Sequence, residues 1–237
     1  MQMVNHYFRV LGKKLKDEHK VVSRVWKKWL RWDSLIRKTP FMERHTQWSR
    51  WRKSRWSSPA PSAVKWAVLR RYGFAEGAWI ESGTYYGRTT AYLAKRASRV
   101  WTIEPSESLA GLAAKKLARF SNVELVRGLS ENVLSGLLQE VESRGEVELS
   151  LWLDGHFSEG GTFLGPSETP IIAELAAVEE RLPNIPRWAI FVDDFRCFEP
   201  ENPKYSTYPT RSFLVAFSER NGLNWTVEHD IFVCWKR

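Results

Sequence analysis

The chain has 237 residues, of which 43% are hydrophobic and 27% charged, with two cysteines and a formal net charge of +9. These proportions suit a globular protein with a sizeable core, and they exclude a disulfide framework and a cysteine-rich zinc site. The sequence contains no apolar run long enough to span a bilayer and no apolar core of a secretory signal. We therefore expect a soluble protein of the reducing cytoplasm.

The positive charge lies in the first quarter of the chain. Residues 1–60 contain 16 Lys and Arg against 4 Asp and Glu, a balance of +12, whereas the remaining 20 basic and 23 acidic residues give −3. The stretch "SSPAPS" at 57–62 is typical of a boundary. The sequence therefore predicts a basic, Trp-rich helical extension at 1–60 and a second domain at 61–237.

Two helical segments are predicted in this extension. One covers 21–38 and is expected to end at Pro40, and the other covers 45–56. Three functional interpretations stay open: a lid or homo-oligomer contact, an element at an anionic membrane surface, or a nucleic-acid-binding surface. A solvated charged face over an aromatic packing stripe is the structural alternative. Because 61–237 is mildly acidic, a membrane surface or an anionic glycan is favoured over RNA.

Strands and helices alternate in the second domain. Strands are predicted at 77–82, 99–105, 123–128, 147–155 and 187–194, with one or two closing strands in 224–236. Helices are predicted at 62–73, 87–97, 107–120, 130–144, 169–182 and 211–222. This order predicts an α/β, Rossmann-like, mostly parallel seven-stranded sheet with helices on both faces. A ligand should then lie beyond the carboxyl ends of the strands.

Small or acidic residues follow each of the first five predicted strands, where that ligand is expected. In strand order they are Glu81 with a glycine turn, Glu104, Gly128 with Ser130, Asp154 with His156, and Asp193 with Asp194. Five successive strand ends of this kind are more informative than any single motif.

The first two strand ends indicate the type of cofactor. Glu81, Gly83 and Gly87 form the pattern E-x-G-x-x-x-G, and Glu104 follows Glu81 by 23 positions. An acid about twenty residues after a glycine-rich turn commonly accepts hydrogen bonds from ribose hydroxyls. An acid at the head of the turn would repel a pyrophosphate but attract an ammonium or sulfonium group. The pattern therefore favours S-adenosylmethionine over NAD.

Four stretches in order, "ESGTYYG", "TIEPS", "LWLDGHFSEGG" and "FVDDFRCF", resemble the class I S-adenosylmethionine-dependent methyltransferases. The similarity covers roughly 60–237, and the last two stretches are most similar to macrocin-type sugar O-methyltransferases. The resemblance implies cofactor contacts from a set of loop residues and from an adenine-bordering set. These are Glu81, Gly83, Thr84, Tyr85, Gly87, Glu104 and Asp154, with Leu129, Ser130 and Glu131 around the adenine.

The resemblance also implies a divalent metal, usually Mg²⁺, bound by Asp154, Asp193 and Asp194. His156 stands where the family has a further acid, and we expect it to act as general base beside Asp154. Three converging carboxylates repel one another unless they are protonated or neutralised, which agrees with a metal. The structural alternatives stay open: Asp193 could cap a turn, Asp194 could be solvated, and His156 could be a loop residue bound to a carboxylate.

Together these observations predict a methyltransferase that acts on a hydroxyl of a sugar or glycoconjugate. Two alternatives remain: a non-catalytic binding protein that docks an anionic partner through its basic extension, and an RNA methyltransferase. Methylation of base nitrogens is disfavoured, because "LDGHF" lacks the Asn/Asp-Pro-Pro-Tyr element of amine-directed relatives.

Overall fold

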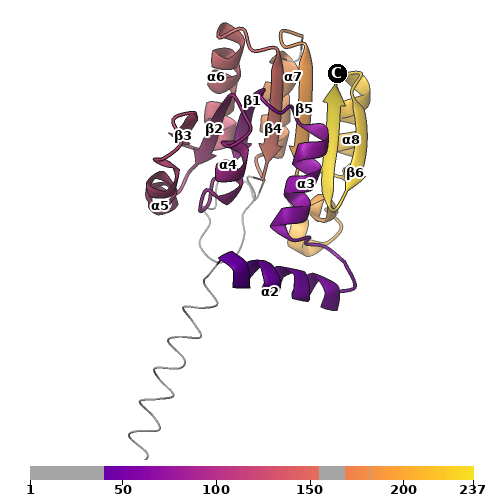
Figure 1. Ribbon diagram of the computed structural model, residues 1–237. Coiled ribbons are helices and arrows are strands. Elements are labelled where there is room, and N and C mark those ends of the chain that lie inside the picture. Colours follow the sequence, from indigo (N-terminus) through magenta and orange to yellow (C-terminus); the bar gives the residue numbers. More distant parts are fainter. Residues whose placement is uncertain (1–39, 155–168, 182) are drawn as a thin grey trace, which may run out of the picture. The chain divides into compact units, whose positions relative to one another are not determined.

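The computed structural model describes residues 40–154, 169–181 and 183–237 (Figure 1). The chain divides into two compact units, Met1–Trp56 and Ser57–Arg237. The helix expected at 21–38 and the position of His156 lie outside the described residues. Within the described part, no helix has the length and apolar character required to cross a membrane.

The described part of the first unit consists mainly of α2 (Pro40–Lys53). Pro40 is the first residue of this helix, a position where a proline lacking its N–H is well tolerated. Tryptophan rings of α2 and of the turn after it pack edge to face. The ring centroids of Trp48 and Trp51 lie 5.5 Å apart, and those of Trp51 and Trp56 lie 4.9 Å apart. The predicted aromatic segment is therefore helical, and it begins earlier than expected.

A seven-stranded sheet in the order β3-β2-β1-β4-β5-β7-β6 forms the centre of the second unit. Its strands are β1 (Ala78–Ser82), β2 (Arg99–Glu104), β3 (Val123–Arg127), β4 (Glu148–Leu153), β5 (Arg187–Val192), β6 (Asn224–Glu228) and β7 (Ile231–Lys236). The pairings among β1 to β5 are parallel, whereas β7 is antiparallel to both β5 and β6. The sheet is therefore mixed, because a two-residue turn after β6 reverses the chain into β7.

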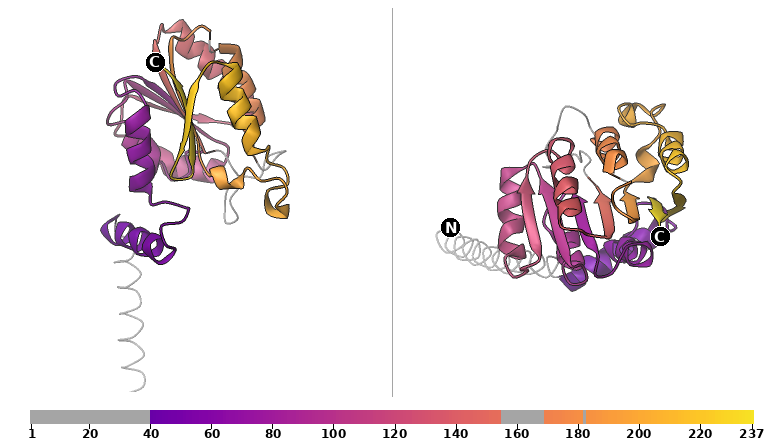
Figure 2. Two further views of the ribbon diagram at one scale, coloured as in Figure 1. Left: turned by 90° about the vertical axis from the view of Figure 1, so that its right-hand side faces the viewer. Right: turned by 90° about the horizontal axis from the view of Figure 1, so that it is seen from above.

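Helices cover both faces of the sheet (Figure 1; Figure 2). On one face lie α3 (Ser62–Tyr72), α4 (Arg88–Leu93) and α5 (Glu107–Leu117). On the other lie α6 (Ser130–Ser143), α7 (Ile171–Arg181) and α8 (Arg211–Arg220). Two short 3₁₀ turns, η1 (Phe195–Cys197) and η2 (Pro203–Tyr205), connect β5 to α8. The Rossmann-like architecture predicted from strand–helix alternation is confirmed.

Each face has its own hydrophobic core. On the α6–α8 face, Leu138 and Phe217 are fully buried against strand residues such as Leu151. On the α3–α4 face, Leu69 and Leu93 pack against the other side of the same strands. Burial of one such side chain contributes about 1.5–3 kcal/mol. The strands are apolar along their whole length because both of their faces are covered.

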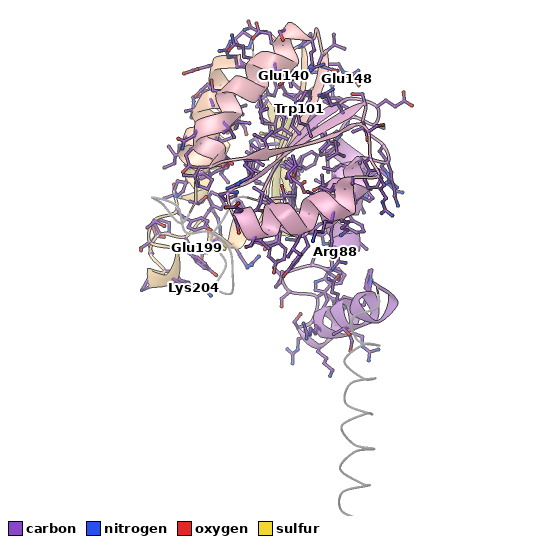
Figure 3. All side chains as sticks on the ribbon, turned by 90° about the vertical axis from the view of Figure 1, so that its left-hand side faces the viewer. Arg88, Trp101, Glu140, Glu148, Glu199 and Lys204 are labelled. Atoms are coloured by element: carbon purple, nitrogen blue, oxygen red, sulfur yellow. The ribbon has the colours of Figure 1, made fainter. Side chains whose placement is uncertain are left out.

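The topology places a ligand site at one end of this sheet. From β1 the chain moves outward through β2 and β3 on one side, and β4 and β5 lie on the other side. Such a switch point leaves a crevice at the carboxyl ends of the strands. Figure 3 shows Arg88, at the start of α4, and Glu199, after β5, at the opposite end of the sheet from Glu148, which begins β4.

Candidate active site

The turn after β1 requires a left-handed backbone at three positions. Gly83 has φ 87°, Tyr85 has φ 50°, and Gly87, which directly precedes α4, has φ 62°. A β-carbon on Gly87 would lie 3.1 Å from Leu117 Cδ1 of α5. The predicted glycine turn is therefore present, and Gly87 is needed both for its backbone conformation and for the close approach of α5.

Glu104, the last residue of β2, lies beside this turn. Its Oε2 accepts a hydrogen bond from the Tyr85 backbone N–H at 2.8 Å, and its Oε1 accepts one from the Ser106 N–H at 3.0 Å. Burial raises the pKa of Glu104, and these two N–H groups partly oppose that shift. A carboxylate has about four lone-pair positions. The hydrogen bonds from the described residues therefore use two of these positions.

Glu81 lies in the interior below the same turn, with only 1% of its surface exposed. Its Oε2 accepts hydrogen bonds from the hydroxyls of Thr90 and Thr102, the latter at 2.7 Å, and Thr102 lies 2.6 Å from the Thr84 hydroxyl. Burial raises the pKa of Glu81 to about 8. Glu81 is therefore largely protonated at neutral pH and holds the base of the turn, and its direct contact with a cofactor stays a prediction.

The end of β3 and the start of α6 form the side where adenine was expected. Gly128 has φ 153°, and Ser130, the first residue of α6, is buried. Glu174 of α7, which the sequence analysis missed, is also buried here, and this burial raises its pKa to about 7 while Ser130 opposes the shift. The Ser82 hydroxyl, which is also buried, opposes the shift as well. A buried acid thus forms part of this region.

The three acids after β4 and β5 lie within electrostatic reach of one another. Burial raises the pKa of Asp193, and the negative charges of Asp154 and Asp194 act in the same direction, whereas the ion pair with Lys65 lowers it. The side chain of Asp193 is 1% exposed. The convergence expected from the parallel strand ends is therefore present.

Two basic side chains of the protein contact this acid cluster. Lys65 of α3 forms a hydrogen-bonded ion pair with Asp193, and its Nζ lies 3.7 Å from Asp194 Oδ1. Arg196 donates to Asp194 Oδ1 at 2.6 Å and also contacts the carboxylate of Asp230. The nearby acids raise the pKa of the Lys65 ammonium above its ordinary value, although burial opposes them.

The β6–β7 turn brings Asp230 to the cluster. His229 and Asp230 have φ values of 51° and 70°, the backbone of a tight two-residue hairpin. Asp230 accepts hydrogen bonds from the backbone N–H groups of Arg196, at 2.8 Å to its carboxylate, and Phe195, at 2.9 Å to its carbonyl. The hairpin therefore fixes the segment after β5, where Asp194 itself has φ 55°.

The expected magnesium site is not supported by this arrangement. Among residues 40–154, 169–181 and 183–237, no group of three or more His, Cys, Asp or Glu side chains is placed to hold a metal ion. Lys65 forms an ion pair with Asp193, and Arg196 forms one with Asp194. A divalent ion about 4 Å from an ammonium would be repelled by roughly 8 kcal/mol at an effective dielectric constant of about 20. Two cations of the protein therefore already offset part of the negative charge of this cluster.

The predicted site residues thus form two groups at the same end of the sheet. The group expected to bind the cofactor lies around β1 and β2, and its members are Glu81, Gly83, Thr84, Tyr85, Gly87 and Glu104. The acid cluster lies around β4 and β5, and its members are Asp154, Asp193 and Asp194. The sequence analysis missed the hydroxyls of Thr90 and Thr102, and it missed Lys65, Arg196 and Asp230. Ser130 lies at the start of α6, and the position of His156 falls in an undescribed range.

No protein-family model matches the chain, and no curated protein sequence matches it. Among solved structures, a protein provisionally assigned as a caffeoyl-CoA O-methyltransferase from Staphylococcus aureus matches with a TM-score of 0.52 and 11% identity, over 89% of this chain and 98% of that one. An O-methyltransferase from Bacillus cereus in complex with SAH (S-adenosylhomocysteine) matches with a TM-score of 0.46 and 21% identity, over 75% of this chain and 81% of that one. An rRNA methylase from Streptococcus thermophilus matches with a TM-score of 0.44 and 16% identity, over 75% of this chain and 95% of that one.

The first of these similarities shows that the chain shares the fold of that protein. Identities this low show the fold alone. The finer resemblance to macrocin-type sugar enzymes, read from the motifs, is not supported by these comparisons.

Proposed function

We propose that the second unit binds S-adenosylmethionine and transfers its methyl group to a hydroxyl oxygen of a sugar or glycoconjugate. The observation that supports this most is the position of Glu104. Its carboxylate ends β2, is oriented by the Tyr85 and Ser106 N–H groups, and keeps acceptor positions beside a left-handed glycine turn. These are the features that the two hydroxyls of a ribose require.

The charges around the turn favour this cofactor over a dinucleotide. Glu81 and Glu104 lie within electrostatic reach of each other. Without a ligand Glu81 is largely protonated, so it can ionise when a cation binds, whereas a nearby anion would keep it protonated. A pyrophosphate would add negative charge to this region, whereas a sulfonium and an ammonium group add positive charge. Binding of a cationic ligand would therefore be favoured, and it would lower the raised pKa values of these acids.

S-adenosylmethionine supplies an electrophilic methyl group on a positively charged sulfur. The acceptor oxygen forms the new bond to the methyl carbon while the carbon–sulfur bond breaks, its electron pair stays on sulfur, and the hydroxyl proton passes to a base. We assign that base to His156, which follows Asp154 by two positions in the sequence. The acid cluster would orient the acceptor by accepting hydrogen bonds from its hydroxyl groups, and much of the rate would come from this alignment.

Calorimetry on the full-length chain tests the proposal. We expect S-adenosylhomocysteine to bind and NAD⁺ not to bind. Incubation of a panel of sugars and glycoconjugates with methyl-labelled S-adenosylmethionine should then show transfer to oxygen. Absence of S-adenosylhomocysteine binding would refute the cofactor assignment. Binding without transfer to any hydroxyl compound would favour a binding protein, and salt-dependent methylation of RNA would favour an RNA enzyme.

We further propose that the basic extension docks on an anionic membrane surface. In α2, Trp48 is 40% exposed and Trp56, just beyond its end, is 55% exposed. Arg50, Arg52 and Lys53 form the basic last turn of this helix. Aromatic rings beside basic side chains suit the headgroup region of an acidic bilayer.

Sedimentation with phosphatidylserine and phosphatidylcholine vesicles tests this partner. We expect binding to the acidic vesicles only, with loss at high salt and with Arg50→Ala/Arg52→Ala/Lys53→Ala. The matched control is Arg70→Ala, which removes an exposed cation from the second unit. Equal binding to both vesicle types, or to neither, would contradict the proposal.

A further inference from the structure

We propose that the Lys65 ammonium is the resident cation of the acid cluster and takes the place of a divalent metal there. Lys65 is then a positioning residue, which holds Asp193 and Asp194 in place without a metal cofactor. Its effect on the acceptor rests on the proposed function, whereas its occupation of the cluster can be tested without it.

The fold gives Lys65 a fixed position. The helix α3 is anchored by Val68 and Leu69, each 1% exposed in the core. Trp66, next to Lys65, stacks on Tyr92 of α4 at 4.8 Å, and its indole N–H donates to Thr89 at 3.3 Å. These contacts fix the rotation of α3 about its axis. The Lys65 side chain therefore points to the end of β5.

The charges that act on Lys65 come from the same three acids that were expected to bind a metal. Asp193, Asp154 and Asp194 each stabilise its ammonium form, and Asp193 also accepts its hydrogen bond. Arg196 binds Asp194 and Asp230 and so provides a second cation at the cluster. A metal ion would have to displace the ammonium from Asp193 or bind beside it.

An ammonium in this position has a different effect from a metal. It has three donors, and among the described residues Lys65 donates one hydrogen bond, to Asp193. Donors therefore remain for an oxygen of the acceptor, and the proton of the attacking hydroxyl passes to a base without help from a metal. Methyl transfer should proceed in the presence of a chelator.

Titration of the full-length protein with Mn²⁺, followed by electron paramagnetic resonance, tests the proposal directly. The wild type and the Asp193→Asn variant should bind the same amount of Mn²⁺, because Asp193 provides no metal site in the wild type. Lys65→Met removes the ammonium from the carboxylates and should gain one Mn²⁺ per chain. Lys65→Arg, which keeps the charge, and Arg70→Met, which removes an exposed cation of the same helix, should gain none.

A double variant keeps the test valid if Lys65→Met folds poorly. Lys65→Met/Asp193→Asn removes both members of the buried pair, and it should fold and bind no Mn²⁺. A wild-type Mn²⁺ site that depends on Asp193, or a folded Lys65→Met that binds no more Mn²⁺ than the wild type, overturns the proposal. S-adenosylhomocysteine binding, measured on the same samples, reports separately on the proposed function.

Discussion

Buried carboxylates lie at the carboxyl ends of both halves of the sheet, and the two halves stabilise them differently. On the β1–β2 side, Glu81 is held by threonine hydroxyls and Glu104 by backbone N–H groups. On the β4–β5 side, Asp193 and Asp194 are held by Lys65 and Arg196. The first half uses neutral donors, and the second uses cations.

This difference bears on the ligands that we propose for the two halves. Neutral donors leave the charge of Glu104 uncompensated, so the β1–β2 side suits a ligand with hydroxyls and positive charge. The cations on the β4–β5 side balance much of the negative charge of Asp193 and Asp194, so that side suits an uncharged, hydroxyl-rich acceptor. A sulfonium nucleoside on one side and a sugar on the other agree with this division.

The largest effect should come from the first half. Glu104→Ala removes the carboxylate that we expect to bind the ribose, and loss of two charge-assisted hydrogen bonds should weaken S-adenosylhomocysteine binding by roughly a hundredfold or more. Calorimetry measures this change. Glu107→Ala, an exposed acid at the start of α5, is the matched control and should bind normally. If Glu104→Ala binds S-adenosylhomocysteine within a few fold of the wild-type affinity, the role assigned to Glu104 on the β1–β2 side is wrong.

The ion pair of the second half should show strong coupling. Lys65→Met leaves Asp193 buried without its cation, and we expect a loss of roughly 3 kcal/mol in the free energy of unfolding. Lys65→Met/Asp193→Asn should recover most of that loss, because no unpaired charge remains. Urea unfolding of the wild type, both single variants and the double variant gives the coupling energy. Additive single effects would show that the pair does not act as a unit.

The buried acids should make stability depend on pH. The folded pKa of Glu81 is about 8, above its ordinary value of 4.5, and that of Glu174 is about 7. Between the ordinary pKa of 4.5 and these raised pKa values, the folded state holds protons that the unfolded state has released. The stability that these two acids contribute is therefore fully present in acid and is lost as the pH rises towards 8.

Glu81→Gln keeps the size of the side chain and removes its titration. The variant should lose part of this pH dependence and be more stable than the wild type at pH 8 by on the order of 2 kcal/mol. Urea unfolding between pH 5 and pH 8 measures the slope. Glu107→Gln serves as the exposed control, and an unchanged slope in Glu81→Gln would contradict the role assigned to burial.

The smallest effects concern the glycines of the cofactor side. Gly87→Ala places a β-carbon at φ 62°, 3.1 Å from Leu117, and should destabilise the protein by about 1–2 kcal/mol. Gly111→Ala, inside α5 with no atom within 4 Å of the added carbon, should stabilise it by about 0.5–1 kcal/mol. Thermal unfolding distinguishes the two. Equal shifts for both variants would argue against a constrained turn.

The sequence was sufficient for the order of the elements and for the residues at the strand ends. Alternating apolar runs and helical periodicity predicted β1 to β5, and parallel strands bring their carboxyl ends together, so the grouping of Asp154 with Asp193 followed from topology. The left-handed turn at Gly83 and Gly87 was readable because glycine tolerates positive φ.

The counter-ions of the acids were not readable. Lys65 lies 128 positions before Asp193, and Arg196 meets Asp230 across 34 positions. No local pattern reports a pair of this kind, because it depends on how α3 packs and on the tip of the β6–β7 hairpin. The sequence therefore indicated that the acids need positive charge, and a metal was inferred where the protein supplies a lysine and an arginine.

A crystal structure of the full-length chain with S-adenosylhomocysteine tests the central claim most directly. The account predicts electron density for the nucleoside at the ends of β1 and β2, with both ribose hydroxyls within hydrogen-bond distance of Glu104. Nucleoside density elsewhere, or a Glu104 carboxylate turned away from the ligand, would contradict it.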